Sequence, residues 1–199
     1  MYAIVENNEI TKLINNPKSI VIGDVRYPAK IFSVWSASEL NAIGIYEVVT
    51  DSSNKKDEKW YINTNESYAF ADNQVTRSWG TATPKAHADR NATDENGVEL
   101  NPVVVIEGLK TQLIRTLKQQ VSNELARTDW YITRNTERET AIPSAISTHR
   151  DAVRTKQAEM ETAITNASDT PALETLYTYT EQDDGSVTRP LGELPTLEI

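Results

Sequence analysis

Cysteine is absent from the 199 residues of the chain, which excludes disulfide bonds and thiolate chemistry. Histidine and glycine are scarce, with two and seven residues. His87 and His149 stand alone, without a second histidine or an HExxH pattern nearby, so the sequence indicates no zinc site. The few glycines form no phosphate-binding loop. These absences favour a protein that works without a metal or a cofactor.

Long hydrophobic runs are also missing. No apolar run approaches the roughly 20 residues that cross a bilayer, and residues 1–8 have neither the basic nor the apolar region of a secretory signal. The sequence therefore predicts a soluble protein made in a cytoplasm, with no membrane insertion. The net charge of -9 repels phosphate backbones, so we expect no nucleic acid as a partner.

Two short matches to functional motifs fail on their details. Residues 52–55 fit the S-x-x-K pattern, but they lie in a polar loop, whereas that chemistry needs the serine and lysine one turn apart on a buried helix. The run from Asp89 begins like a calcium loop, but Asp94 replaces the required glycine and Leu100 the required glutamate. We expect no catalytic residues and interpret the chain as a non-enzyme.

Residues 1–83 are typical of a small β-rich domain with one short helix. Apolar segments alternate with turn residues such as Gly23-Asp24, where glycine accepts the positive φ of a tight hairpin turn. The capping box Ser36-Ala37-Ser38-Glu39 predicts the start of the helix. The predicted strands are 2–5, 10–14, 20–22, 25–27, 45–50, 60–62, 67–71 and 75–79.

The aromatic residues of this domain have two interpretations. They can fill the core of a small sheet, which is the commoner use of aromatics at alternating strand positions. They can also form an exposed face that binds a glycan. The residues concerned are Trp35, Trp60, Tyr61, Tyr68, Phe70 and Trp79.

The second half of the chain is predicted to be mainly helical. Residues 84–102 are polar and contain proline and glycine, which indicates a linker. Residues 103–180 are predicted to form an antiparallel helical hairpin and a short third helix. Residues 181–199 are predicted to be a C-terminal β-hairpin and tail, turning at Asp183-Asp184-Gly185. The fold class expected for the whole chain is α+β.

The helix boundaries follow from apolar spacing and from proline. A stripe at steps of three and four residues predicts a helix over 105–127. Pro143-Ser144 begins a second helix, and Asp169-Thr170-Pro171 begins the third. The first stripe consists of Ile106, Leu109, Leu113, Leu117, Val121 and Leu125. The second stripe consists of Ile146, Val153, Met160, Ala163, Ile164 and Ala167.

These stripes can pair with each other or build an oligomeric coiled coil. His149 and Lys156 interrupt the second stripe, which favours an intramolecular hairpin with one wet or partner-covered side. Trp130 and Tyr131 follow the first long helix. They can close the open end of the hairpin as a plug, or serve as a docking anchor, because Trp and Tyr are frequent at interface hot spots.

Two segments resemble a motif of tailed bacteriophages. They are Leu125-Ala126-Arg127-Thr128-Asp129-Trp130 and His149-Arg150-Asp151-Ala152-Val153-Arg154. The resemblance is to the phage tail assembly chaperone family and to C-terminal parts of tail-fibre and fibre-assembly proteins, in which a T-D-W turn precedes a helix bearing Y-R-x-A-L-R. Thr128, Asp129, Trp130, Arg150, Ala152 and Arg154 match, while His149 and Val153 replace tyrosine and leucine.

The resemblance implies a location in the virion tail after synthesis in the host bacterial cytoplasm. It also implies other phage tail or fibre proteins as partners, and a homo-oligomer within the virion. The second helix continues past Arg154, and the β-rich domain is more than a minimal chaperone needs, so we expect a structural or adaptor component of the tail. The alternatives are a tail or tail-fibre assembly chaperone absent from the virion, and a receptor- or glycan-binding tail module.

The motif residues also have physical roles that do not depend on the family. Thr128 or Asp129 is suited to cap the chain after the helix break. Arg150 and Arg154 are one turn apart, so both are expected to reach carboxylates such as Asp129 or Glu124. Trp130 is expected to pack between the two helices, against Leu125, Ala152 and Val153.

Overall fold

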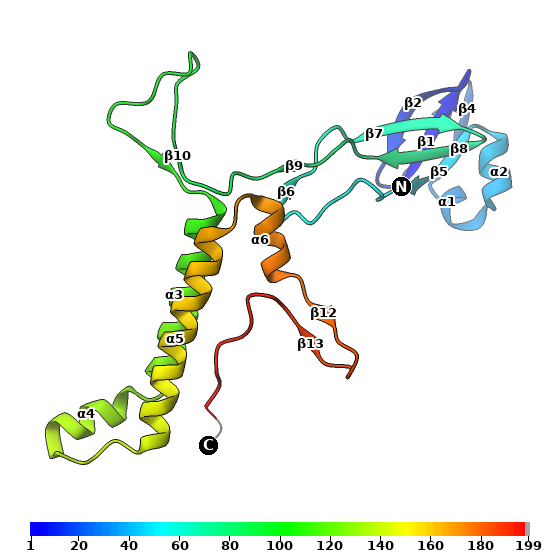
Figure 1. The fold of residues 1–199 in the computed structure, drawn as a ribbon. Coiled ribbons are helices and arrows are strands. Elements are labelled where there is room, and N and C mark those ends of the chain that lie inside the picture. The colour runs from blue at the N-terminus through cyan, green and yellow to red at the C-terminus, as the bar shows by residue number, and fades with distance from the viewer. Residues whose placement is uncertain (198–199) are drawn as a thin grey trace. The chain divides into compact units, whose positions relative to one another are not determined.

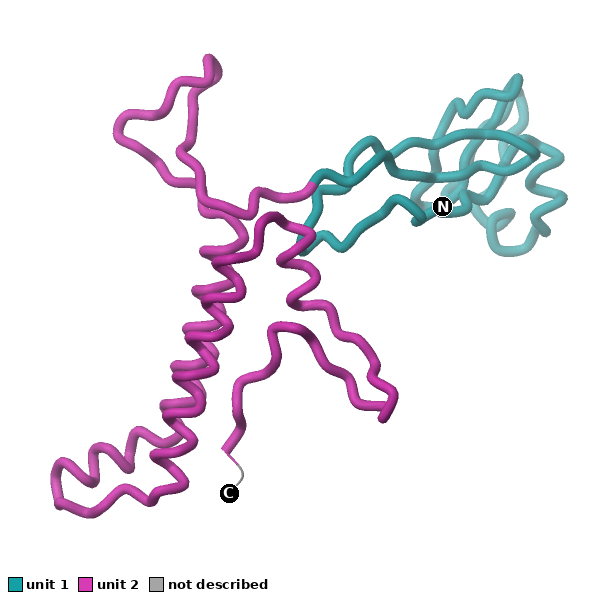
Figure 2. The backbone as a smooth tube through the Cα atoms, viewed as in Figure 1, with its two compact units in different colours: residues 1–83 teal, residues 84–199 magenta. Residues whose placement is uncertain are grey.

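The computed structural model describes residues 1–197. Its contacts divide the chain into two compact units, Met1–Thr83 and Pro84–Ile199 (Figure 2). The first unit is built on a curled β-sheet, and the second contains long helices and a small C-terminal β-hairpin (Figure 1). The expected α+β class is confirmed.

Five strands form the sheet of the first unit, in the order β2-β1-β5-β8-β7. Neighbouring strands are antiparallel except for β5 and β8, which run parallel. A separate hairpin of β3 and β4 turns at Gly23, whose φ is 57°. The strands are β1 (Tyr2–Glu6), β2 (Glu9–Ile14), β3 (Ile20–Ile22), β4 (Val25–Tyr27), β5 (Ile45–Thr50), β6 (Tyr61–Ile62), β7 (Ser67–Ala71), β8 (Gln74–Ser78) and β9 (Thr83–Pro84).

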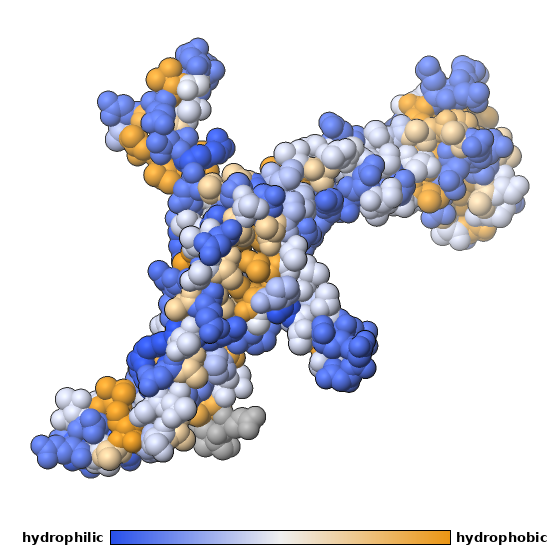
Figure 3. All heavy atoms as spheres, in the orientation of Figure 1, coloured by the Kyte–Doolittle hydropathy of each residue, from blue (hydrophilic) through white to orange (hydrophobic). Residues whose placement is uncertain are grey.

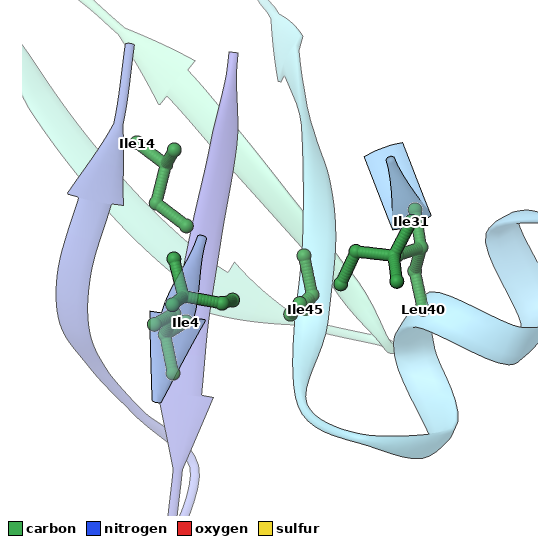
Figure 4. Packing of buried hydrophobic residues seen from close by; sticks show 6 residues of the cluster. Ile4, Ile14, Ile31, Leu40 and Ile45 are labelled. Atoms are coloured by element: carbon green, nitrogen blue, oxygen red, sulfur yellow. The ribbon is translucent and has the colours of Figure 1, made fainter. Parts of the chain in front are cut away.

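The alternation of side chains along β1 gives the sheet two apolar faces. Ile4 packs on one face with residues from β2, β5 and the helices (Figure 4). Its neighbours Ala3 and Val5 point to the other face, where they pack with Val75 of β8. The larger cluster consists of Ile4, Ile14, Ile20, Ile31, Leu40 and Ile45.

Two short helices cover the larger cluster, where the sequence predicted one. α2 (Ala37–Ala42) begins at the predicted capping box, with the Ser36 side chain accepting from the Glu39 amide and the Glu39 carboxylate accepting from the Ser36 amide. α1 (Ile31–Val34) was not predicted. It is a single turn that buries only Ile31, too short to show a helical period in the sequence.

The second unit contains α3 (Leu109–Ala126), α4 (Asp129–Arg138), α5 (Ser144–Asn166) and α6 (Thr170–Tyr177). α3 and α5 pack along each other in opposite directions. At one end the Lys110 ammonium donates to the Thr165 carbonyl, and at the other the Arg150 guanidinium donates to the Leu125 carbonyl. The buried apolar residues of the two helices are Leu109, Leu113, Leu117, Val121, Ile146, Val153, Met160 and Ile164.

The sequence predicted no helix between residue 127 and Pro143, but α4 occupies most of this stretch. None of the residues of α4 is buried, so no apolar face marked this helix in the sequence. α4 ends at Glu139, which adopts the left-handed conformation with a φ of 54°. The chain then reaches α5 through residues 140–143.

The predicted linker is also wrong, because residues 90–106 form a β-hairpin. β10 (Arg90–Asn91) pairs with β11 (Val105–Ile106), and a further bridge joins Thr93 and Glu99. Ile106 therefore belongs to a strand, although the sequence placed it in the first helix. The Asp89 carboxylate explains the later start of α3, since it accepts from the Gly108 amide and from the Thr111 hydroxyl. A carboxylate at a helix N-terminus satisfies free amides there and complements the helix dipole.

The C-terminal segment confirms two predictions. α6 begins after Asp169, whose carboxylate accepts from the Ala172 amide. β12 (Thr180–Glu181) and β13 (Val187–Thr188) form the expected hairpin. The chain then returns to α6, where Leu191 is buried and its amide donates to the Leu176 carbonyl. Residues 198–199 of the predicted tail lie outside the described residues.

Gly44 offers a test of the close backbone contact between Gly44 and Val5 in the first unit. Its φ is +79°, and a Cβ placed there would lie 2.7 Å from the Val5 carbonyl oxygen. Gly44→Ala is expected to lower the free energy of unfolding by more than about 2 kcal/mol, because backbone strain adds to a clash with backbone.

Gly23→Ala is the matched control, since Gly23 also has a positive φ but no atom within 4 Å of the added Cβ. It should cost only about 1 kcal/mol. Urea denaturation of the full chain measures both values. Equal losses would show that the close approach to Val5 carries no energy.

Candidate partner-binding site at the junction of α3, α4 and α5

The Arg150 guanidinium lies at the centre of the junction. α5 places Arg150 beside its buried apolar residues Ile146 and Val153, and the side chain is 10% exposed. Its Nη1 donates to the Leu125 carbonyl at 2.8 Å, the Thr128 hydroxyl at 2.7 Å and the Asp129 carboxylate at 2.9 Å. One nitrogen thus joins the end of α3, the connecting residue and the start of α4.

Thr128 is buried, with 1% of its surface exposed. Its position is the N-cap of α4, but its side chain accepts no amide of that helix. The hydroxyl instead donates to the Leu125 carbonyl at 3.0 Å and accepts from Arg150. The predicted side-chain cap by Thr128 is therefore wrong, because the Leu125 carbonyl and the buried guanidinium together use the hydroxyl.

Electrostatics favour two of the three partners of Arg150. The Leu125 carbonyl belongs to the last turn of α3, where the helix dipole attracts a cation. Asp129 stands in the first turn of α4, where the dipole attracts an anion. The Asp129 carboxylate is 61% exposed, so its pairing with Arg150 is partly screened by solvent.

Glu124 and His149 form a second polar contact beside the first. The His149 Nε2 lies 3.1 Å from the Glu124 carboxylate, and their side chains are only 6% and 15% exposed. Burial by itself raises the pKa of Glu124, but hydrogen bonds and charge from Arg127 and His149 outweigh burial and lower the pKa of this carboxyl below its ordinary value. The sequence indicated Glu124 as a partner for an arginine of α5, whereas its partner from α5 is His149.

Arg154 lies outside this cluster, so the expectation that both arginines reach Asp129 or Glu124 is wrong for Arg154. Its guanidinium pairs with Asp151, one turn earlier on α5, and its side chain is 53% exposed. The fully buried Val153 marks the direction in which α5 faces α3. At about 100° per residue, Arg150 is about 60° from that direction and Arg154 about 100°. Arg154 therefore points further from α3 than Arg150 does and lies on the solvent side of α5.

Trp130 is 52% exposed, so the prediction that it packs between the helices is wrong. α4 begins at Asp129 and holds Trp130 in its first turn, while Arg150 and Thr128 already occupy the end of the helix pair. The Trp130 ring instead stacks on Tyr131, with 3.9 Å between ring centroids. The exposure of Trp130 also shows that this side chain does not close the open end of the hairpin as a plug.

The Arg134 guanidinium lies over both rings, 4.7 Å from the Trp130 centroid and 5.5 Å from that of Tyr131. Such stacking holds the arginine in a fixed position. Arg134 was not predicted as a site residue. The spacing of four residues from Trp130 was a usable signal, but it has meaning only on a helix, and no helix was predicted for this stretch.

Three of the aromatic residues of the first unit are placed in the interior. Trp60 and Tyr61 are each 3% exposed and Trp79 is 8% exposed, which favours the core interpretation over an exposed glycan-binding face. Trp35 is partly buried and packs against the larger apolar cluster.

Within residues 1–197, no cluster of three or more histidine or acidic side chains is arranged to hold a metal ion. No helix in that range combines the length and the apolar character needed to span a membrane.

Comparison of the chain with family models, with curated proteins and with solved structures finds no match.

Replacing Arg150 tests whether the junction depends on it. Arg150→Ala is expected to lower the free energy of unfolding by about 2–4 kcal/mol, because it leaves the Leu125 carbonyl and Thr128 hydroxyl without their charged donor. Arg154→Ala is the matched control and should change it by no more than about 0.5 kcal/mol, since its ion pair is exposed. Urea denaturation with both variants decides the point, and equal effects would contradict the central role of Arg150.

Glu124 generates a prediction about pH. Because its folded pKa is below the ordinary value of 4.5, the carboxylate stabilises the fold above about pH 4.5, and this contribution is lost as pH falls through the folded pKa. Other carboxyl groups also titrate there, so the comparison is with Glu124→Gln. We expect the variant to be less stable at pH 7 and to lose less stability between pH 5 and 3. Parallel stability–pH curves would contradict the assignment.

Proposed function

We propose that the chain is a non-enzymatic structural or adaptor component of a phage tail, associated with the tail fibre or baseplate and retained in the virion. Its working part would be the antiparallel helical hairpin formed by α3 and α5. α4 would present the residues that contact another tail protein.

One observation carries this proposal. The two halves of the phage-like motif are about 20 residues apart in the sequence, yet Thr128, Asp129 and Arg150 share one hydrogen-bonded cluster. The antiparallel pairing of α3 and α5 brings these residues to the same end of the helix pair, and the hydrogen bonds join them there. The cluster supports the view that the motif is a structural device for fixing one helix on another.

The hydrogen-bonded cluster fixes α4 so that one face of this helix is exposed. Arg150 and Thr128 hold the start of α4, and the first turn presents Trp130 to solvent, with the partly buried Tyr131 beside it. Trp, Tyr and Arg are the residues most enriched among binding hot spots. A fixed aromatic pair costs little conformational entropy on binding, which suits a permanent adaptor.

A tail or tail-fibre assembly chaperone remains the second candidate. The same exposed face on α4 favours it, because a transient helper also needs an accessible anchor for its client. The two candidates differ in whether the chain stays in the finished particle.

Mass spectrometry of purified virions from a phage encoding the chain separates them. We expect the chain in mature particles at a fixed ratio to the other tail proteins. Its absence from mature particles, together with its presence in assembly intermediates, would favour the chaperone.

The variant Trp130→Ala tests whether the exposed face of α4 is needed for incorporation into the virion. Trp130→Ala should leave unfolding unchanged, because Trp130 is largely exposed, and should reduce incorporation about tenfold or more if Trp130 is a hot spot. Tyr179→Ala is the matched control, since Tyr179 is also an aromatic residue with 52% exposure in the same unit. Normal incorporation of Trp130→Ala would remove α4 as the anchor.

A further inference from the structure

The Arg134 face of α4 consists of Trp130, Tyr131, Arg134 and Arg138. At four-residue spacing, Trp130, Arg134 and Arg138 follow one side of the helix, and Tyr131 borders them. Glu137 lies at the margin of this face, three residues after Arg134 and seven after Trp130. The Arg134 guanidinium lies over the two rings and has no ion pair or hydrogen bond with the described residues, although its Nε is covered. The guanidinium is positioned but lacks a carboxylate, so the face is complementary to an acidic partner.

An acidic surface occurs in the same unit, on the hairpin of residues 90–106. This hairpin is named the acidic hairpin. Its charged residues are Arg90, Asp94, Glu95 and Glu99, which gives one positive and three negative charges. The carboxylates of Asp94 and Glu99 accept hydrogen bonds within the hairpin. Glu95, at its turn, is exposed and has no partner among the described residues. The free carboxylate thus stands at the most accessible point.

Apolar side chains accompany these carboxylates. Val98 and Val103 are 62% and 59% exposed, and the other exposed apolar residues of the hairpin are Leu100, Val104, Val105 and Ile106. In the space-filling view, hydrophobic residues gather on this hairpin (Figure 3). An exposed apolar patch of this kind marks an interaction site. Together with Glu95, it matches the aromatic rings and guanidinium of the Arg134 face in both apolar character and charge.

The two surfaces cannot meet within one copy, because α3 separates them. The acidic hairpin joins the start of α3, where Asp89 binds Gly108 and Thr111. α4 joins its end, where Arg150 binds Leu125 and Asp129. Eighteen helical residues span about 27 Å, and Figure 1 shows the hairpin and α4 at opposite ends of α3.

We propose that these surfaces bind each other between copies of the chain, so that the Arg134 face of one copy takes the acidic hairpin of the next. Because the two surfaces differ, the contact is head-to-tail and closes into a ring or extends as a filament. The occupant of the Arg134 face is thus a second copy, whose hairpin supplies the carboxylate at Glu95 and the apolar residues around it. The proposal rests on the proposed function only in using the same face of α4.

Charge reversal of the full-length chain tests the contact. We expect the unmodified chain to self-associate with rising concentration in sedimentation velocity, and to dissociate as salt is raised. Arg134→Glu alone and Glu95→Arg alone should each weaken association roughly tenfold or more, because each places like charges in contact. Both residues are at the surface of their elements, so circular dichroism should show the folded state in both variants.

Mixing the two variants is the decisive step. In the mixture, the carboxylate introduced by Arg134→Glu meets the guanidinium introduced by Glu95→Arg, and the reverse contact is the unmodified pair of Arg134 and Glu95, so association should return. Lys118→Glu is the control, since it makes the same reversal on an exposed part of α3 outside both surfaces. The proposal is overturned if the unmodified chain stays monomeric, if Arg134→Glu associates normally, or if mixing restores nothing. None of these results depends on whether the chain is found in virions.

Discussion

The buried guanidinium of Arg150 is the interaction on which the second unit depends. A cation in that position is tolerable only if acceptors surround it, and α3, the connecting Thr128 and α4 each supply one. The same bonds reach the Leu125 carbonyl in the last turn of α3, which also accepts from the Thr128 amide. Removing the cation would therefore disturb three segments at once, which is why one side chain of α5 can set the direction of a helix that has no buried residue of its own.

α3 is held at both of its ends by charged side chains from other segments. The Asp89 carboxylate binds its beginning, and the Arg150 guanidinium binds its end. Each charge has the sign that the helix dipole favours at that end. The acidic hairpin and α4 are thereby attached at opposite ends of a rigid helix. That separation gives two different surfaces, one acidic and one with free arginine, a geometry suited to a contact between copies.

Much of the fold was predictable because its signals are local. The capping box at Ser36 and the proline-marked starts of α5 and α6 each depend on a few neighbouring residues, and each was found. α4 and the hairpin of residues 90–106 were missed because neither buries an apolar face, and burial is what creates a readable period. α1 was missed for its length.

For the candidate site, the sequence by itself determined the helical stripes, the grouping of Thr128, Asp129 and Arg150 as one motif, and the charge that Arg150 carries. Tertiary structure decided the rest. Burial of Arg150 beside Val153, and exposure of Arg154 one turn later, depend on where α3 contacts α5. The exposure of Trp130 has the same origin: once Arg150 and Thr128 fill the end of the helix pair, α4 leaves it and carries the aromatic ring into solvent, an outcome that no spacing in the chain encodes.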